Sequence, residues 1–230
     1  MSFVTPSLLP LVKTLKNMTF SPILERNLQS ENALIVDLST TSKLWDELKD
    51  GMSFEDVIAV NARMIQAQIT IGRYNEERTI YQGRDHFAES PSRSLHIGID
   101  LGVPSGVKVQ APLDGCIHSF ADNSDVGDYG PTIILQHNVD GIIFHTLYEH
   151  LSRQSLQHKA PGMKIKAGMV FATIGNTDEN GGWAPHLHFQ IINDIQGQYG
   201  DYPGVVDPEQ ADYYLANCPD PNLILKRPDL

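Results

Sequence analysis

From about Tyr74 onward the sequence is divided into short β-type runs, and this division constrains the fold more than any other feature. Glycine, proline, asparagine and aspartate separate runs that are rich in β-branched and aromatic residues, which favour strands. The clearest runs are residues 106–110, 115–120, 132–136, 141–147, 170–174 and 187–192. Many short strands at close intervals predict an antiparallel β sandwich or barrel.

The first part of the chain has a different pattern, with apolar residues at helical spacing from Ser7 to about Gln68. One such stretch surrounds Trp45, and a second runs from Phe54 to Ile65, where Ser53 and the acidic residues after Phe54 are typical of a helix start. Residues 33–38 form a short apolar run between the helical stretches that fits a strand.

These patterns predict an α+β, mainly β fold with three regions. We expect a small helical N-terminal subdomain at residues 1–72 and an antiparallel β domain at residues 73–195. A tail at residues 196–230 should pack on the β domain through a short helix, which Pro208 opens at its first position.

Composition narrows the possible partners. The 230 residues, 41% of them hydrophobic, suffice for one well-buried core and a smaller appendage. A formal net charge of -11 argues against nucleic acid and against an anionic membrane surface, because both would be repelled. The two cysteines, Cys116 and Cys218, are expected to be free thiols. Nothing in the sequence specifies an oligomeric state.

Targeting signals are not evident in the sequence. The N-terminus lacks a basic region, residues 8–12 are too short and too interrupted by proline for a signal-peptide core, and no run of apolar residues approaches a membrane span. We therefore expect a cytoplasmic protein, with a periplasmic location or export by another route as the alternative.

Three short pieces of sequence carry chemistry. Residues 96–100, 148–150 and 186–188 contain four histidines and one aspartate. His186 and His188 lie two apart in a strand-like run, so both side chains face the same way. His96 and Asp100 would lie about 13 Å apart in a straight strand, too far to share one metal ion, so the chain must bend, and Gly98 permits the bend. Because the cysteines form no ligand-like pair, we expect a catalytic metal site and not a structural one.

Together these motifs resemble the lysostaphin-type (LytM-like) zinc metalloendopeptidases of peptidoglycan. The resemblance covers about residues 90–193 and includes residues 103–106, 111–115, 146–152 and 185–189. It implies a fold of the duplicated hybrid motif type, with Zn²⁺ held by His96, Asp100 and His188. It also implies that His150 and His186 are catalytic histidines beside the metal.

The activity that the resemblance implies is hydrolysis of peptide bonds by a metal-activated water, with a peptide or peptidoglycan fragment as the partner. His150 and His186 would divide two roles: accepting a proton from water, and stabilising the oxyanion or protonating the leaving amine. The sequence does not assign these roles. It also departs from the family pattern, because residues 88–93 contain no tyrosine where many members have one.

A second resemblance concerns the flanks. Residues 73–78 and 200–208 look like those of the endopeptidase-like module found in fusion proteins between a kinase-like domain and a class III aminotransferase. A module of that kind would act on a cytosolic muropeptide or another small amide, or would have no catalytic activity.

Two alternatives stay open at this point. Residues 111–115 and 162–169 resemble lipoyl-type and sugar-phosphotransferase carrier domains, but in the carriers the first of these runs precedes the His-x-Gly-Ile-Asp segment, whereas here it follows. A pseudoenzyme that binds a partner is the other alternative, although none of the ligands is missing.

Several residues near the motifs have simpler interpretations. His137 and His145 are expected to be packed or hydrogen-bonded strand residues, and His86, His118 and His158 to serve packing or face solvent. Glu149 is expected to be a solvated charge that faces away from His150. Residues 175–183 should form a loop that walls the cleft, with Trp183 either contacting substrate or packing.

Overall fold

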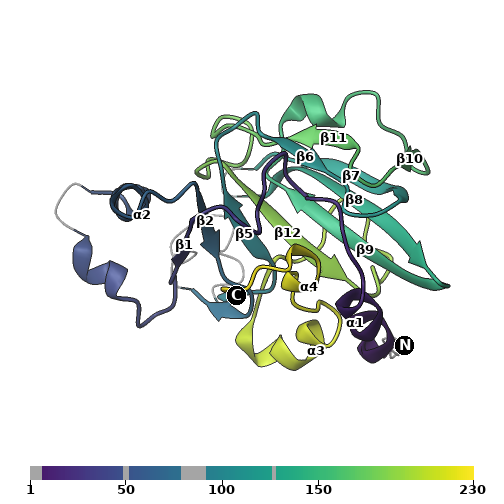
Figure 1. Ribbon diagram of the computed structural model, residues 1–230, viewed down its shortest axis with the longest axis horizontal. Helices are drawn as coiled ribbons and strands as arrows, with labels where there is room; N and C mark the ends of the chain where they lie inside the picture. Colours follow the sequence, from purple (N-terminus) through teal and green to yellow (C-terminus); the bar gives the residue numbers. More distant parts are fainter. Residues whose placement is uncertain (1–6, 49–51, 79–91, 126–127) are drawn as a thin grey trace.

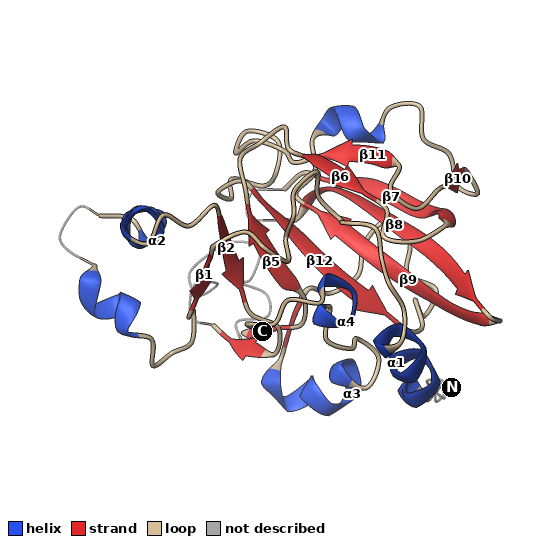
Figure 2. Ribbon diagram, in the orientation of Figure 1, coloured by secondary structure: helices blue, strands red, loops and turns tan. Residues whose placement is uncertain are grey.

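A computed structural model describes residues 7–48, 52–78, 92–125 and 128–230. Its central feature is a large sheet that crosses the molecule obliquely (Figures 1 and 2). In the described part of the chain this sheet has eight strands, in the order β1 (Ala33–Val36), β2 (Ile69–Gly72), β5 (Ile99–Gly102), β12 (His186–Ile192), β9 (Ile142–Glu149), β8 (Gly130–Val139), β7 (Gly115–Asn123) and β10 (Lys164–Ile165). β1 pairs with β2 in parallel, and the other neighbours pair antiparallel.

Two smaller sheets complete the β structure of the described residues. β11 (Val170–Thr173) pairs with β6 (Lys108–Gln110), while β4 (Leu95–His96) lies between β13 (Val205–Val206) and β3 (Glu76–Glu77). The prediction of a mainly β, antiparallel fold with a small helical N-terminal region is confirmed, and the sheets stay open without closing into a barrel.

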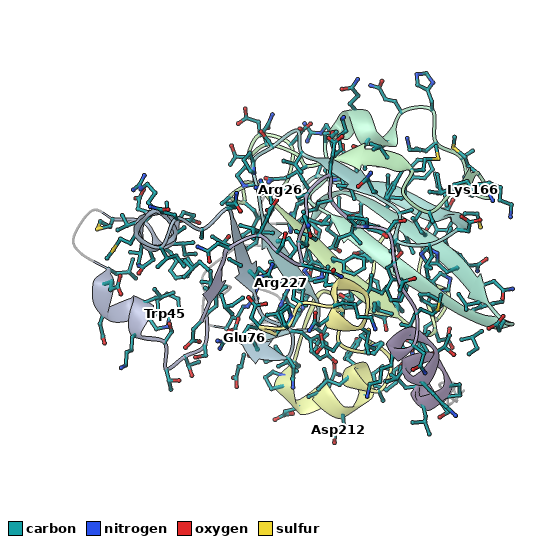
Figure 3. The ribbon with its side chains drawn as sticks, in the orientation of Figure 1. Arg26, Trp45, Glu76, Lys166, Asp212 and Arg227 are labelled. Carbon is teal, nitrogen blue, oxygen red and sulfur yellow. The ribbon has the colours of Figure 1, made fainter. Side chains whose placement is uncertain are left out.

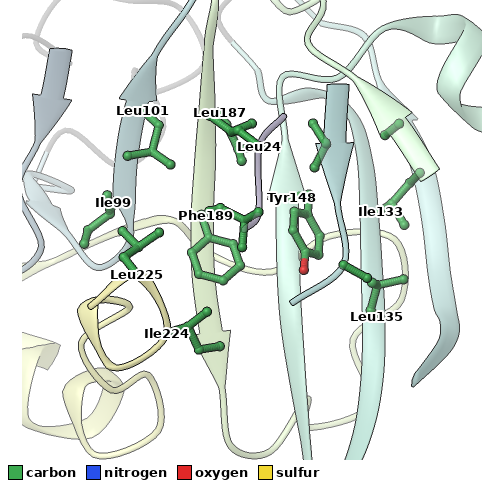
Figure 4. Packing of buried hydrophobic residues seen from close by; sticks show 14 of the residues in the cluster. Leu24, Ile99, Leu101, Ile133, Leu135, Tyr148, Leu187, Phe189, Ile224 and Leu225 are labelled. Atoms are coloured by element: carbon green, nitrogen blue, oxygen red, sulfur yellow. The ribbon is translucent and has the colours of Figure 1, made fainter. Parts of the chain in front are cut away.

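Both faces of the large sheet are covered by a hydrophobic cluster. Consecutive residues of a strand point to opposite faces, so neighbouring side chains enter different clusters. On β8 and β9, Ile133 and Tyr148 enter the main core, whereas Ile134 and Leu147 enter a second cluster. Figure 4 shows the main core, where residues of β5, β8, β9 and β12 meet Leu24 and the C-terminal Ile224 and Leu225. The second cluster is completed by residues near the chain end, among them Tyr202, Val206 and Cys218.

The N-terminal residues contribute both helices and strands. Helix α1 (Leu8–Lys16) buries Leu11 and Leu15 in the main core. The short 3₁₀ helix η1 (Lys43–Glu47) and helix α2 (Phe54–Met64) lie farther along, and a capping box between Ser53 and Asp56 starts α2 as its sequence predicted. β1 and β2, however, extend the large sheet, so these two strands of the predicted N-terminal subdomain share a sheet with the predicted β domain. The domain boundary at residue 72 stays a prediction.

The C-terminal residues return to the sheet. Asp207 accepts a hydrogen bond from the Glu209 N–H and starts η4 (Pro208–Gln210), which leads into α3 (Ala211–Leu215), and α4 (Asn222–Leu225) follows. One more 3₁₀ helix, η3 (Arg153–Leu156), follows β9. Within the described ranges, no helix is long and apolar enough to cross a membrane.

Candidate metal centre and its cavity

The bend predicted between His96 and Asp100 is present, because the two residues lie in different sheets. His96 ends β4 and pairs with Val205, whereas Asp100 lies in β5 and pairs with His188. Gly98 is needed here for space: a Cβ atom at this position would lie 2.4 Å from Cε1 of His188. The small residue therefore allows the chain to turn directly against the His188 ring.

His96, Asp100 and His188 form a compact cluster of electron-pair donors. The distance from His96 Nε2 to His188 Nδ1 is 3.0 Å. Asp100 Oδ1 lies 3.1 Å from His188 Nδ1 and 3.2 Å from His96 Nε2. Among the described residues, this is the one group of three or more potential ligands whose donor atoms lie mutually close, within 4.8 Å.

In His96 and His188, the ring nitrogen that points away from the cluster has a hydrogen-bond partner that shows whether it carries a proton. His96 Nδ1 lies 2.8 Å from the Arg73 carbonyl oxygen, which can only accept a hydrogen bond. His188 Nε2 lies 3.1 Å from Gln190 Oε1, and the Gln190 amide nitrogen donates to the Pro203 carbonyl. Both outer nitrogens are therefore N–H donors. Burial and the charge of Arg78 lower the pKa of His96 to about 4, so its ring is neutral near pH 7.

This donor set fits a metal ion. Two imidazole nitrogens and a carboxylate oxygen point toward one another, an arrangement that a cation between them stabilises. Two histidines and one acidic residue are also a ligand set that zinc takes in catalytic sites, where a fourth position stays open.

Arg78 holds the carboxylate of this cluster in place. Its guanidinium donates to Asp100 Oδ2 at 2.6 Å and to Glu76 Oε2 at 2.9 Å, and only 1% of its side chain is exposed. Asp100 is thereby fixed with Oδ1 toward the imidazoles. Burial alone would raise the pKa of Asp100, but the neighbouring His96 and Arg78 hold it well below its usual range.

His150 and His186 lie beside the cluster with their rings 4.2 Å apart between centroids. His150 Nδ1 donates to the Asn180 carbonyl at 3.1 Å, and His186 Nδ1 donates to the Ala184 carbonyl at 2.6 Å. Each ring thus keeps Nε2 as an acceptor, and His186 Nε2 lies 3.9 Å from Asp100 Oδ1. Burial lowers the pKa of both rings, so both are neutral proton acceptors near pH 7.

The backbone of His150 is unusual, with a φ of 60° directly after the end of β9. A non-glycine residue with positive φ is uncommon and marks a position that the surrounding structure determines. The His150 N–H donates to the Tyr129 carbonyl, and its own carbonyl accepts from Gly175. These bonds hold the turn that delivers the ring to the cluster.

The expectation that Glu149 is solvated is wrong. Its side chain is fully buried, and within the described part of the chain neither carboxylate oxygen has a hydrogen-bond partner. Oε2 lies 3.9 Å from His188 Nε2, because Glu149 and His188 are directly paired strand neighbours. Burial, reinforced by Asp201 and Asp128, raises the pKa of Glu149 well above its usual range.

A cavity of about 470 Å³ contains the whole constellation. Its lining residues include the cluster, His150, His186 and Trp183, so Trp183 is the residue of the loop at 175–183 that lines the cavity. N-terminal residues line another part of the cavity, here called the N-terminal wall: Val36, Leu38, Trp45, Phe54, Glu55, Ile58 and Ala59. Figure 3 labels Trp45, which lies in η1, and Glu76, the second acidic partner of Arg78.

The sequence did not indicate Arg78, Glu76 or the N-terminal wall as parts of the site. Arg78 and Asp100 are separated by 22 residues, and no motif spacing links them. The flank resemblance includes residues 73–78, but it assigns them no role in the site. The acidic pair Glu76-Glu77 and the following Arg78 carry no pattern that would distinguish a buried ion pair from a solvated one.

Other histidines lie away from the cluster. His137 is buried and hydrogen-bonded to the Asp114 carbonyl and to Thr146 Oγ1, as expected for a packed strand residue. His145 is also buried, and its ring packs edge-on against His118. His158 is exposed. His86 and residues 88–91 lie outside the described residues.

The cluster falls within a segment that matches a known family. Residues 94–201 match the family model described as peptidase family M23. These residues make up just under half of the chain, and the segment they form is similar to peptidase family M23. The M23 segment begins two residues before His96 and includes all five residues that the sequence marked as site residues. The resemblance to lysostaphin-type endopeptidases is thus confirmed at the level of the family.

Solved structures give partial matches. A zinc-containing peptidase from Vibrio cholerae matches with 26% identity over 43% of this chain and 27% of its own, at a TM-score of 0.35. An M23 peptidase from Pseudomonas aeruginosa, described as putative, matches with 20% identity over 56% of this chain and 42% of its own, at a TM-score of 0.37. The catalytic domain of lysostaphin from Staphylococcus simulans matches with 28% identity over 50% of this chain and 77% of its own, at a TM-score of 0.36.

The match therefore spans well under two thirds of the Vibrio and Pseudomonas proteins. A search of curated proteins gives no match.

Proposed function

We propose that this protein is a zinc-dependent endopeptidase whose metal is held by His96 Nε2, Asp100 Oδ1 and His188 Nδ1. One observation carries the proposal: three lone pairs converge within 3.0–3.2 Å of one another, while the outer polar atoms of the same side chains are already bonded. The match of residues 94–201 to the model of peptidase family M23 supports the same conclusion. Bound zinc supplies a Lewis acid that polarises a carbonyl group and acidifies water.

The other site residues have roles in moving protons. His150 and His186 are held as neutral rings with Nε2 free to accept, so each is ready to act as a general base near pH 7. The histidine that gains the proton can then donate it to the leaving amine. Because His150 is the more deeply buried and sits on a constrained turn, it is the better fixed of the two.

The proposed substrates are peptides, and peptidoglycan-derived peptides are the first class to test because the motifs resemble peptidoglycan endopeptidases. The flank resemblance adds small cytosolic amides to the test panel. Cleavage adds one water across the amide bond and releases a carboxylate and an amine, so no further co-reactant is needed.

The test combines metal analysis with mass-spectrometric detection of cleavage in peptidoglycan fragments and small amides. We expect one zinc per chain and a cleaved amide bond in the native protein. His188→Ala should lose the zinc, whereas His150→Ala should keep it and lose cleavage. His158→Asn is the matched control, because His158 is an exposed histidine with positive φ, which asparagine tolerates. Full zinc occupancy in His188→Ala would refute the ligand set.

A further inference from the structure

We propose that η1, α2 and β1 form an apolar subsite, and that the substrate therefore carries a bulky uncharged side chain within two residues of the scissile bond. The inference rests on the proposed peptidase function and specifies its substrate. It is drawn from the N-terminal wall of the cavity, which lies outside the segment that matches the family.

The position of the wall follows from strand register. Across four adjacent strands, His188 pairs with Asp100, Asp100 with Gly72, and Gly72 with Val36. Directly paired residues on neighbouring strands point to the same face of a sheet. Val36 therefore lies on the same face as Asp100 and His188, two strand spacings or roughly 10 Å from Asp100.

Gly72 lies between the wall and the cluster and is packed closely against Arg78 and Asp100. A Cβ at this position would lie 2.7 Å from Arg78 Nη2 and 3.0 Å from Asp100 Oδ2. The glycine thus leaves room for the Arg78 guanidinium at the floor of the cavity. The same cavity is lined by the cluster, by Gly72 and by Val36.

Aromatic and aliphatic side chains form most of the wall. The rings of Trp45 and Phe54 stack with 5.0 Å between centroids, and the Trp45 indole N–H donates to the Ser39 carbonyl at 2.7 Å. The indole is thereby fixed, and it keeps no N–H to offer a polar substrate group. Ile58, one turn along α2 from Phe54, lines the same cavity.

The charges around the cavity select against an anionic occupant at this wall, where Glu55 of α2 is also among the lining residues. Arg78 is the only lysine or arginine among the described lining residues, and its donors already engage Asp100, Glu76 and the Arg73 carbonyl. A substrate carboxylate or phosphate would thus find no new cationic partner there. A glycine-rich peptide would leave the wall in contact with water, whereas a Leu, Met, Phe or Trp side chain would cover it.

The required reach agrees with peptide dimensions. A peptide that binds in extended form advances about 3.3 Å per residue, and a bulky side chain extends several ångströms more. With the scissile carbonyl at the cluster, the side chain that meets the wall belongs to one of the two residues nearest that bond on one side.

The first experiment is cleavage of an unbiased peptide library by the full chain, read by mass spectrometry. We expect cut sites to be enriched in large apolar residues at one fixed position within two residues of the bond. Because one methylene in a hydrophobic pocket changes selectivity by about tenfold or more, leucyl over glycyl peptides should be favoured at least tenfold in kcat/KM. Cleavage without such a preference would overturn the subsite and leave the proposed peptidase function intact.

A pair of variants on the same helix provides the control. Ile58→Gln places a polar group on the wall and should reduce the leucyl-to-glycyl preference about tenfold or more. Val60→Gln makes the same kind of change on the exposed side of α2, where Val60 is 37% exposed and does not line the cavity, and should leave the preference unchanged. An equal effect of both variants would contradict the assignment.

A binding measurement separates failure of the subsite from failure of the peptidase proposal. The chain has two tryptophans, Trp45 and Trp183, and both line the cavity. In Trp183→Phe, fluorescence therefore reports Trp45 alone.

N-acetylphenylalanine amide should shift this emission and bind at least tenfold more tightly than N-acetylglycine amide, with or without zinc. Preferential binding of the phenylalanine amide, together with no cleavage in the peptide library, would support the subsite and refute the peptidase function. Equal binding of the two amides would refute the subsite.

Discussion

Gly98→Ala offers a sharp test of the role of His188. The added Cβ would lie 2.4 Å from Cε1 and 2.5 Å from Nε2 of the His188 ring, and 3.0 Å from the Phe189 carbonyl oxygen. An ordinary contact between such atoms is about 3.5–4.0 Å, so the ring must move by roughly 1 Å or more. Metal–ligand distances tolerate only about 0.2 Å of error, so a displacement of this size removes His188 Nδ1 from the ligand set.

The expected result is a loss of zinc affinity of at least 100-fold, measured by competition with a chromophoric chelator. The overpacking should also lower the free energy of unfolding of the metal-free protein by about 1–3 kcal/mol. Gly204→Ala is the graded control, because its Cβ would meet His188 Nε2 at 3.0 Å and needs a shift of only a few tenths of an ångström. Wild-type zinc affinity in Gly98→Ala would refute the reasoning that His188 Nδ1 binds the metal.

Three further predictions concern stability. Arg78→Met leaves the carboxylates of Glu76 and Asp100 without their shared cation, so urea unfolding of the metal-free protein should show a loss of about 3–5 kcal/mol; wild-type stability would contradict the buried ion pair. Burial lowers the pKa of His145 from 6.5 to about 4, so the unfolded chain binds its proton more readily and stability rises with pH between these values. In His145→Gln this rise in unfolding free energy should shrink by about 3 kcal/mol across that range, and an unchanged pH profile would refute the assignment. Saturating zinc should raise the Tm of the native protein and leave that of His188→Ala unchanged.

Much of the fold could be predicted because its signals are local. The short strands follow from runs of β-branched residues between turn residues, and the start of α2 follows from Ser53 and Asp56. The parallel pairing of β1 with β2 could not be predicted, because η1 and α2 lie between the two strands and no local pattern specifies which strands pair. For the same reason, the contribution of residues 33–72 to the large sheet became visible only in the structure.

In the candidate site, the residues linked by local spacing were predictable, whereas those that strand pairing brings in were not. The shared direction of His186 and His188 follows from strand geometry, and the bend at Gly98 follows from the reach of the chain. Glu149 was misjudged because β9 is covered on both faces, so alternation along the strand does not place a side chain in solvent. Arg78 directly follows β3, which pairs with β4, and Trp45 lies in the connection between the paired strands β1 and β2, so strand pairings bring both distant segments to the site. Such partners leave no trace in motif spacing.

The measurement that tests the central claim most directly is anomalous X-ray diffraction at the zinc edge on crystals of the zinc-loaded protein. The account predicts one peak, about 2.0–2.2 Å from His96 Nε2, Asp100 Oδ1 and His188 Nδ1, with a fourth position not filled by protein. A zinc peak bound by other side chains, or no peak after reconstitution with zinc, would contradict it.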